Sequence, residues 1–167
     1  MVNAAGAWAA QVEGAPENCR PHVFPIKGEM LAIEIPVGFV RHTTWVPRAY
    51  LVPRADGRLL VGATAQDAGF DARVTAGGIE ALLHAAVQAL PALRDFTVSE
   101  TWAGLRPATP DERPCLGGTA LQGYFMACGH YRNGILLTPA TARLLADAVE
   151  GVHAPSDAFA LGRFAVR

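Results

Sequence analysis

An arginine and an asparagine occupy a glycine-flanked turn at residues 129–134, directly after a short apolar stretch at 124–128. The apolar residues behind the turn, with Thr138-Pro139, indicate that a helix begins there. Backbone N–H groups at a helix N-terminus lack partners within the helix and can hold an electron-rich group. The guanidinium of Arg132 can bind a carboxylate through two parallel hydrogen bonds. The turn is therefore a candidate ligand site, although these residues alone fit a tight turn with a solvated arginine equally well.

A second arginine, Arg106, lies in the stretch 102–111, whose two prolines favour a turn. Together with residues 129–137, this stretch resembles the C-terminal half of the glycine oxidases, flavoenzymes of the D-amino-acid oxidase family of FAD-dependent oxidoreductases. Three further segments fit the resemblance, in the family's order and at roughly its spacing: residues 2–8, 25–30 and 50–54. The resemblance extends from about residue 2 to residue 151, which is nearly the whole chain.

The resemblance implies oxidative deamination of glycine or another small amino acid to an oxo acid, ammonia and hydrogen peroxide, with a connection to thiamine biosynthesis. Within the same family, the alternative is a D-amino-acid or sarcosine-type oxidase or dehydrogenase. A different class also remains open, in which the isolated chain is a non-catalytic substrate-binding or interaction domain.

Enzymes of this family hold the FAD pyrophosphate at a Gly-x-Gly-x-x-Gly turn, and the sequence contains no such motif. We therefore expect the chain to be the C-terminal portion of a longer oxidase, whose N-terminal FAD-binding half is its partner. Related sarcosine oxidases attach FAD to a cysteine where this chain has Arg106-Pro107. The resemblance thus implies non-covalent FAD in the complete protein, and weak or absent FAD and no activity in this chain alone.

The resemblance also assigns roles to individual residues. Arg106 in Gly-Leu-Arg-Pro matches the family's substrate arginine, and Tyr50 in Tyr-Leu-Val-Pro-Arg matches its active-site tyrosine. The candidate substrate-binding residues are Tyr50, Arg106 and Arg132. The candidate cofactor-binding residues, whose backbone would line the flavin, are His130, Tyr131, Arg132, Asn133, Gly134, Ile135 and Leu136. Without the resemblance, a sheet-edge salt bridge would account for Arg106 and an ordinary strand tyrosine for Tyr50.

Charge and composition limit the classes of partner that the chain is expected to bind. The formal net charge of −1 gives no electrostatic basis for binding nucleic acid or an anionic membrane surface. Three cysteines without CxxC spacing favour a reducing cytoplasm over a disulfide framework, and the histidines show no metal-ligand spacing. Half of the residues are hydrophobic (51%) and only 17% are charged, which suits a core plus surface that is covered by a neighbour. We expect a homo-oligomer.

Local patterns predict an α+β fold with a mostly antiparallel mixed sheet and helices on one side. The predicted strands are 30–33, 46–53, 59–63, 96–101 and 124–128, with a hairpin at Asp56-Gly57. The predicted helices run from an N-cap at Thr75 to Pro91, and over 139–149 before a C-cap at Gly151. Residues 1–10 are interpreted as a remnant of the FAD-binding domain, 11–115 as the substrate-binding domain, 116–152 as a C-terminal strand–loop–helix of the FAD domain, and 153–167 as a tail.

Overall fold

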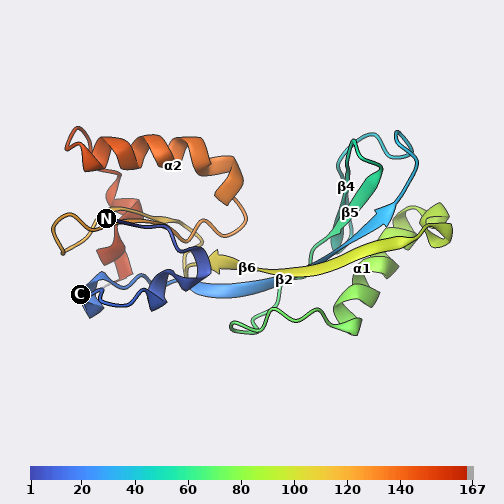
Figure 1. Cartoon of the computed structure of the whole chain (residues 1–167), viewed down its shortest axis with the longest axis horizontal. Helices are drawn as coiled ribbons and strands as arrows, with labels where there is room; N and C mark the ends of the chain where they lie inside the picture. The colour runs from blue at the N-terminus through green and yellow to red at the C-terminus, as the bar shows by residue number, and fades with distance from the viewer. Residues whose placement is uncertain (165–167) are drawn as a thin grey trace. The chain divides into compact units, whose positions relative to one another are not determined.

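The computed structural model describes residues 1–164, so the last three residues of the predicted tail lie outside the described part (Figure 1). The chain forms two compact units. The central unit is Lys27–Leu105, and the terminal unit joins Met1–Ile26 to the described residues from Arg106 onward. Within residues 1–164, no helix is long and apolar enough to cross a membrane.

A five-stranded sheet in the order β3-β4-β5-β2-β6 is built from Phe24–Glu34 (β2), Thr44–Val46 (β3), Ala49–Pro53 (β4), Arg58–Gly62 (β5) and Val98–Ala108 (β6). The pairs β3–β4, β4–β5 and β5–β2 are antiparallel. The predicted hairpin at Asp56-Gly57 is confirmed, since Arg54 and Arg58 close it with a backbone hydrogen bond of 2.8 Å. Gly57 adopts a φ of 85°, the left-handed conformation that this turn requires.

Helix α1 (Ala76–Ala89) packs its apolar face on β4 and β5. Leu82, Ala85 and Ala86 are buried against strand residues such as Leu51 and Val61. The predicted N-cap is confirmed, because the Thr75 hydroxyl accepts a hydrogen bond from the Gly78 N–H at 3.1 Å. Pro91 begins a short 3-10 helix, Pro91–Asp95, where the α-helix has ended.

Lys27 and Glu29 form a buried ion pair at 3.2 Å beneath the start of α1. The Glu29 carboxylate accepts a 2.8 Å hydrogen bond from the Thr75 N–H, and the Lys27 ammonium also donates to the Arg73 carbonyl at 3.1 Å. Burial raises the pKa of Glu29, but the Thr75 hydrogen bond and the Lys27 charge outweigh burial and lower it. The pair thus fixes the loop before α1 to β2.

The terminal unit has a second sheet, in the order β1-β8-β7, formed by Val2–Asn3 (β1), Cys115–Gly118 (β7) and Phe125–Cys128 (β8). β1 pairs with β8 in parallel, and β7 pairs with β8 antiparallel. Helix α2 (Gly134–Val149) packs on β7 and β8, and its C-cap is Glu150. The predicted cap residue Gly151 lies one position later, with the left-handed φ of 72° that commonly follows a helix end. Asn3 is buried and donates hydrogen bonds to the Ala9 carbonyl at 2.9 Å and to the Tyr124 hydroxyl at 3.0 Å.

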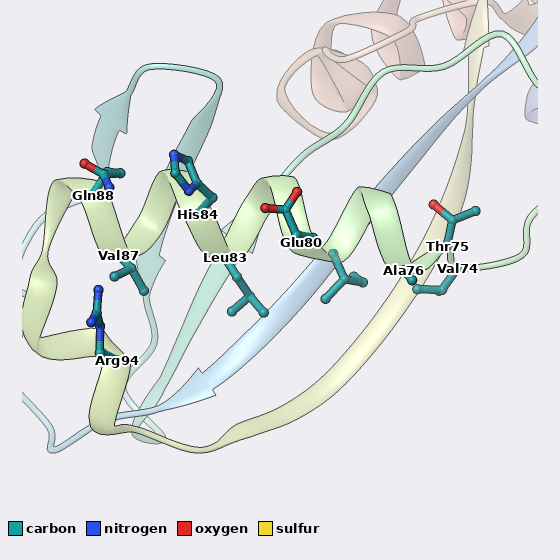
Figure 2. Close-up of a pocket in the computed structure, with 10 residues that line it drawn as sticks. Val74, Thr75, Ala76, Glu80, Leu83, His84, Val87, Gln88 and Arg94 are labelled. Carbon is teal, nitrogen blue, oxygen red and sulfur yellow. The ribbon is translucent and has the colours of Figure 1, made fainter.

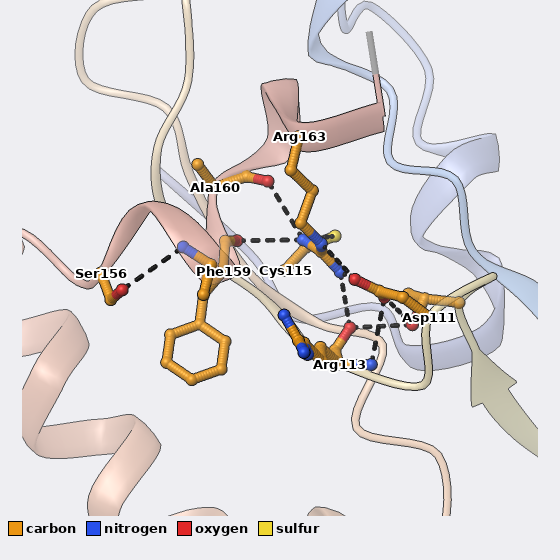
Figure 3. Close-up of polar contacts among 9 residues, drawn as sticks. Asp111, Arg113, Cys115, Ser156, Phe159, Ala160 and Arg163 are labelled. Carbon is orange, nitrogen blue, oxygen red and sulfur yellow. Dashed lines mark hydrogen bonds and ion pairs between the residues drawn. The ribbon is translucent and has the colours of Figure 1, made fainter.

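Short 3-10 helices complete both ends of the terminal unit. Gly6–Gln11 and Glu17–Cys19 follow β1, and Asp157–Phe159 and Leu161–Phe164 follow α2. Arg163 holds the last of these in place through contacts with Asp111, at 2.9 and 3.0 Å, and with the Arg113 carbonyl at 2.7 Å (Figure 3).

Three element predictions were wrong in detail. Residues 46–53 are not one strand, because a turn at Pro47-Arg48 separates β3 from β4, and Arg48 has a φ of 68°. Arg106 does not lie in a turn, because β6 continues through it to Ala108. Helix α2 starts at Gly134 rather than at 139, so Pro139 lies inside it. Strand β7 was not predicted. The predicted α+β class with mostly antiparallel strands is confirmed, and the strands are divided between two sheets.

Candidate functional site

The turn at residues 129–133 is set by a glycine that has no room for a side chain. Gly129 is buried with a φ of 78°, and a Cβ there would lie 2.7 Å from the Thr109 side chain. Thr109 is itself fixed, because its hydroxyl donates to the Arg113 carbonyl at 2.8 Å. The turn after β8 therefore packs tightly against the residues that follow β6.

A backbone hydrogen bond joins the two arginine motifs. The Tyr131 N–H donates to the Pro107 carbonyl oxygen at 2.8 Å. Tyr131 adopts a φ of 51°, which is uncommon for a residue with a side chain and often accompanies a functional turn. Arg106 and Arg132 each adjoin one end of this bond, so the structure brings their backbones together within the terminal unit.

The side chains of the turn have different surroundings. His130 is half-buried and its Nε2 lies 2.9 Å from the Thr141 hydroxyl on α2, and burial lowers the pKa of His130. Its imidazole is therefore neutral near pH 7 and anchors the turn to the helix. Arg132 is exposed, and its guanidinium lies over the Tyr131 ring at 5.1 Å from the ring centroid. Arg132 thus presents a cation at the surface beside an aromatic face.

The start of α2 offers uncommitted donors. Asn133 makes no side-chain capping hydrogen bond, and the Leu137 N–H is the first to bond back, to the Asn133 carbonyl at 2.9 Å. The N–H groups of residues 134–136 thus have no partner within the helix. Ile135 and Leu136 are 94% and 78% exposed. Helix-terminal N–H groups between large exposed apolar side chains are suited to an electron-rich group with an apolar face.

Tyr50 lies in the central unit, in a row of residues that crosses four strands. The strand register aligns Trp45 with Tyr50, Tyr50 with Gly62, and Gly62 with Met30. The Tyr50 hydroxyl lies 3.9 Å from the Met30 sulfur, and the rings of Trp45 and Tyr50 are 5.3 Å apart. A Cβ at Gly62 would lie 2.7 Å from that hydroxyl, so only glycine leaves this position for Tyr50.

The predicted site residues thus fall into two groups. Arg106 and the predicted flavin-lining residues, His130 to Leu136, lie together in the terminal unit, whereas Tyr50 belongs to the central unit and is described there by itself. Several residues that contact these groups were not assigned a role from the sequence. They are Pro107, Thr109 and Thr141 in the first group and Met30, Trp45 and Gly62 in the second. A glycine in the middle of an apolar strand pattern is a signal of close packing that could have identified Gly62.

A cavity of about 640 Å³ runs along α1, and none of the predicted site residues lines it (Figure 2). Its apolar lining includes Ile79, Leu83 and Val87. Figure 2 shows Glu80, His84 and Gln88 on one side of the helix and Arg94 on the other, so the polar groups do not converge on one point. The cavity is an open helix flank without the arrangement that binding a small polar substrate needs.

Known proteins match this chain over nearly its whole length. Residues 1–148 match the model of the DAO family, described as FAD dependent oxidoreductase. The chain is 43% identical over 152 residues to the glycine oxidase of Geobacillus kaustophilus. This alignment covers 90% of this chain and 40% of that protein. It is 42% identical over 153 residues to the bifunctional protein ThiO/ThiG of a Synechocystis species, covering 89% of this chain and 22% of that protein.

Solved structures agree. The crystal structure of glycine oxidase from Geobacillus kaustophilus superposes with a TM-score of 0.88 at 40% identity, covering 99% of this chain and 45% of that chain. Iminodiacetate oxidase from a Chelativorans species gives a TM-score of 0.87 at 33% identity, covering 96% of this chain and 45% of that one. The chain therefore spans less than half the length of these relatives.

Proposed function

This chain belongs to the DAO family of FAD-dependent oxidoreductases, and on that premise we propose that the protein containing it oxidises glycine or a similarly small amino acid. The products are an oxo acid, ammonia and hydrogen peroxide. The observation that carries the proposal is the 2.8 Å hydrogen bond between Tyr131 and Pro107, which unites the two family motifs that bear cationic side chains. The implied role in thiamine biosynthesis stays a prediction.

The substrate carboxylate is bound by arginine in this proposal. Arg106 is half-buried in β6, and a guanidinium there can make a two-pronged contact that a lysine ammonium cannot. Arg132 adds a second positive charge at the turn. In the central unit, Tyr50 is proposed to bind substrate through its hydroxyl, in the position that Gly62 and Met30 leave for it. No side-chain base is assigned.

The residues at the start of α2 fit a flavin. The uncapped N–H groups of residues 134–136 would stabilise negative charge, and Ile135 and Leu136 provide apolar contact. FAD, when bound, supplies the two-electron acceptor for the substrate's α-C–H bond. We propose that it is held without a covalent bond and mainly by the N-terminal half of the protein, so that this chain alone binds it weakly.

Exposed apolar side chains support a covered surface on the terminal unit. Val2, Trp8, Ile135 and Leu136 are 43%, 51%, 94% and 78% exposed, and large apolar side chains that form an exposed patch are commonly covered by another domain or subunit. We propose that the N-terminal half of the protein is the partner and that the complete protein forms a homo-oligomer. Cys19, Cys115 and Cys128 are all free, which supports a location in the reducing cytoplasm.

The proposal is tested with the full-length protein, loaded with FAD and offered glycine, sarcosine, D-alanine and iminodiacetate. Peroxide release and oxo-acid formation are measured for each substrate at several concentrations. The proposal predicts the highest kcat/KM for glycine. A clear preference for sarcosine or D-alanine would support the alternative oxidase within the family, and peroxide release with none of the four would contradict the function.

A further inference from the structure

Two free cysteines face each other across the small sheet of the terminal unit. The register of β7 and β8 places Cys115 directly opposite Cys128, and both side chains are buried, with exposures of 0% and 1%. Residues directly opposite in an antiparallel pair lie on the same face of the sheet, with Cα atoms about 4.5–5.5 Å apart. This separation falls within the range of about 4.4–6.8 Å that a disulfide spans.

The surroundings of Cys115 favour its thiolate. The Arg163 guanidinium lies 3.4 Å from the Cys115 sulfur, and Figure 3 shows it between that sulfur and Asp111. A hydrogen bond from the Cys128 thiol lowers the pKa of Cys115 to about 7, with help from the Arg163 charge and against the effect of burial. The same hydrogen bond raises the pKa of Cys128, which therefore keeps its proton. A thiolate beside a thiol is the pairing that forms a disulfide most readily.

We propose that Cys115 and Cys128 are a peroxide-sensitive dithiol that closes reversibly to a disulfide. The Cys115 thiolate attacks one oxygen of hydrogen peroxide, the O–O bond breaks, and the departing hydroxide takes a proton to become water. The sulfenic acid formed on Cys115 is then attacked by the Cys128 sulfur, and a second water leaves. The two thiols lose two electrons and two protons, and one peroxide becomes two waters.

The position of the pair connects it to the candidate site and to the C-terminal segment. Cys128 directly precedes Gly129 and the 130–133 turn, whereas Cys115 is covered by the 3-10 helix Leu161–Phe164, which carries Arg163. Disulfide formation removes the thiolate that Arg163 contacts and fixes β7 to β8 where the turn begins. We therefore expect the oxidised form to hold its 157–164 segment less tightly. The inference relies on the proposed function only for the cell's source of peroxide.

The experiment uses this chain, purified and fully reduced, with added hydrogen peroxide as the probe. After timed exposure, free thiols are blocked under denaturing conditions, and the protein is analysed by intact mass and by peptide mapping without reductant. Cys19 is the internal control, because it is buried in the same core at 1% exposure but lies in a 3-10 helix and not in the paired strands that align Cys115 with Cys128. Variants C115S, C128S and C19S are treated in parallel, and limited proteolysis monitors the 157–164 segment.

The proposal predicts the loss of two hydrogen atoms, a linked peptide pair containing Cys115 and Cys128, and full reversal by dithiothreitol. C19S should behave like the unchanged chain, whereas C128S should accumulate oxygen on Cys115, and cleavage in 157–164 should become faster in the oxidised chain. A linked pair that includes Cys19, stable oxygen addition to Cys115 while Cys128 stays free, or thiols that react only when the chain is unfolded would each overturn it. Because peroxide is added, none of these outcomes depends on the oxidase activity.

Discussion

The backbone N–H of Tyr131 lies 2.8 Å from the carbonyl oxygen of Pro107, and this hydrogen bond joins two segments that are distant in sequence. One segment places Arg106 in an edge strand, and the other places Arg132 in the turn before α2. The relative position of the two cationic residues therefore depends on the turn keeping its backbone conformation. Changes that disturb the turn should alter the function of both.

Gly129→Ala should destabilise the chain by about 2–4 kcal/mol, because the new Cβ meets Thr109 at 2.7 Å and the φ of 78° disfavours a side chain. Gly123→Ala is the matched control. Gly123 has a similar φ of 75° but open space around it, so only the conformational cost of about 1–2 kcal/mol applies. Urea denaturation measures both free energies of unfolding. Equal losses in the two variants would mean that the contact with Thr109 is unimportant.

Gly62→Ala should displace the Tyr50 hydroxyl, because a Cβ would lie 2.7 Å from it and 2.8 Å from the Met30 methyl group. A hydrogen bond to a charged group contributes about 1.5–3 kcal/mol, so kcat/KM for glycine in the full-length enzyme should fall by about 10- to 150-fold. Tyr50→Phe should produce a similar loss. Gly104→Ala, in a strand position with open space, should leave the kinetics unchanged. Normal kinetics in Gly62→Ala with a folded protein would argue against a role for Tyr50.

Gly77 and Gly78 should respond in opposite directions to alanine. A Cβ at Gly78 would coincide with the buried Glu29 carboxylate, so Gly78→Ala should cost more than about 2 kcal/mol of stability. Gly77 has open space and no unusual φ, and alanine there should stabilise the first turn of α1 by about 0.5–1 kcal/mol. Thermal unfolding of the two single variants measures the difference. A stabilising Gly78→Ala would show that Glu29 does not occupy this position.

Asp111 should make stability depend on acidity. Its hydrogen bonds from Arg163 outweigh burial and hold the pKa of Asp111 well below the usual value of about 3.9. A carboxylate with a lowered pKa in the folded state contributes its full stability above about pH 4, and the contribution is lost as the pH falls toward the folded pKa. The Asp111 side chain is 32% exposed, so solvent screening limits the contribution to about 1–2 kcal/mol.

Asp111→Asn should therefore be less stable than the unchanged chain at pH 6, and the difference should shrink steadily below pH 4. Urea midpoints at pH 6, 4 and 3 test this directly. Glu13→Gln, at an exposed position, serves as the control for changes in net charge. A constant difference between the two proteins across this range would show that the pairing of Asp111 with Arg163 does not control its titration.

Local chemistry was sufficient to predict several elements of the fold. The Thr75 hydroxyl, the Asp56-Gly57 turn and Gly151 each act through neighbours only a few residues away, so their positions could be read from the sequence. Strand β7 could not be predicted, since Cys115–Gly118 is short and contains two glycines, and its pairing depends on β8.

Arg106 illustrates a different limit. The two nearby prolines favoured a turn. However, β6 is an edge strand, where a proline without a backbone N–H need not break a hydrogen bond between strands. The roles of the site residues came from resemblance to a family and not from spacing alone. The contacts that support those roles, such as Pro107 with Tyr131 and Gly62 with Tyr50, depend on how the chain packs and could not be found in a single sequence.

The central claim is that the guanidinium of Arg106 binds the substrate carboxylate, and steady-state kinetics of Arg106→Ala in the full-length, FAD-loaded enzyme test it most directly. A charged hydrogen-bonded pair contributes about 2–5 kcal/mol, so kcat/KM for glycine should fall by roughly 30- to 5,000-fold, mostly through KM. Arg106→Lys should recover only part of the loss, FAD content should be nearly unchanged, and Arg54→Ala at the exposed hairpin should have little effect. Normal kcat/KM in Arg106→Ala, with a loss in Arg54→Ala instead, would contradict the account.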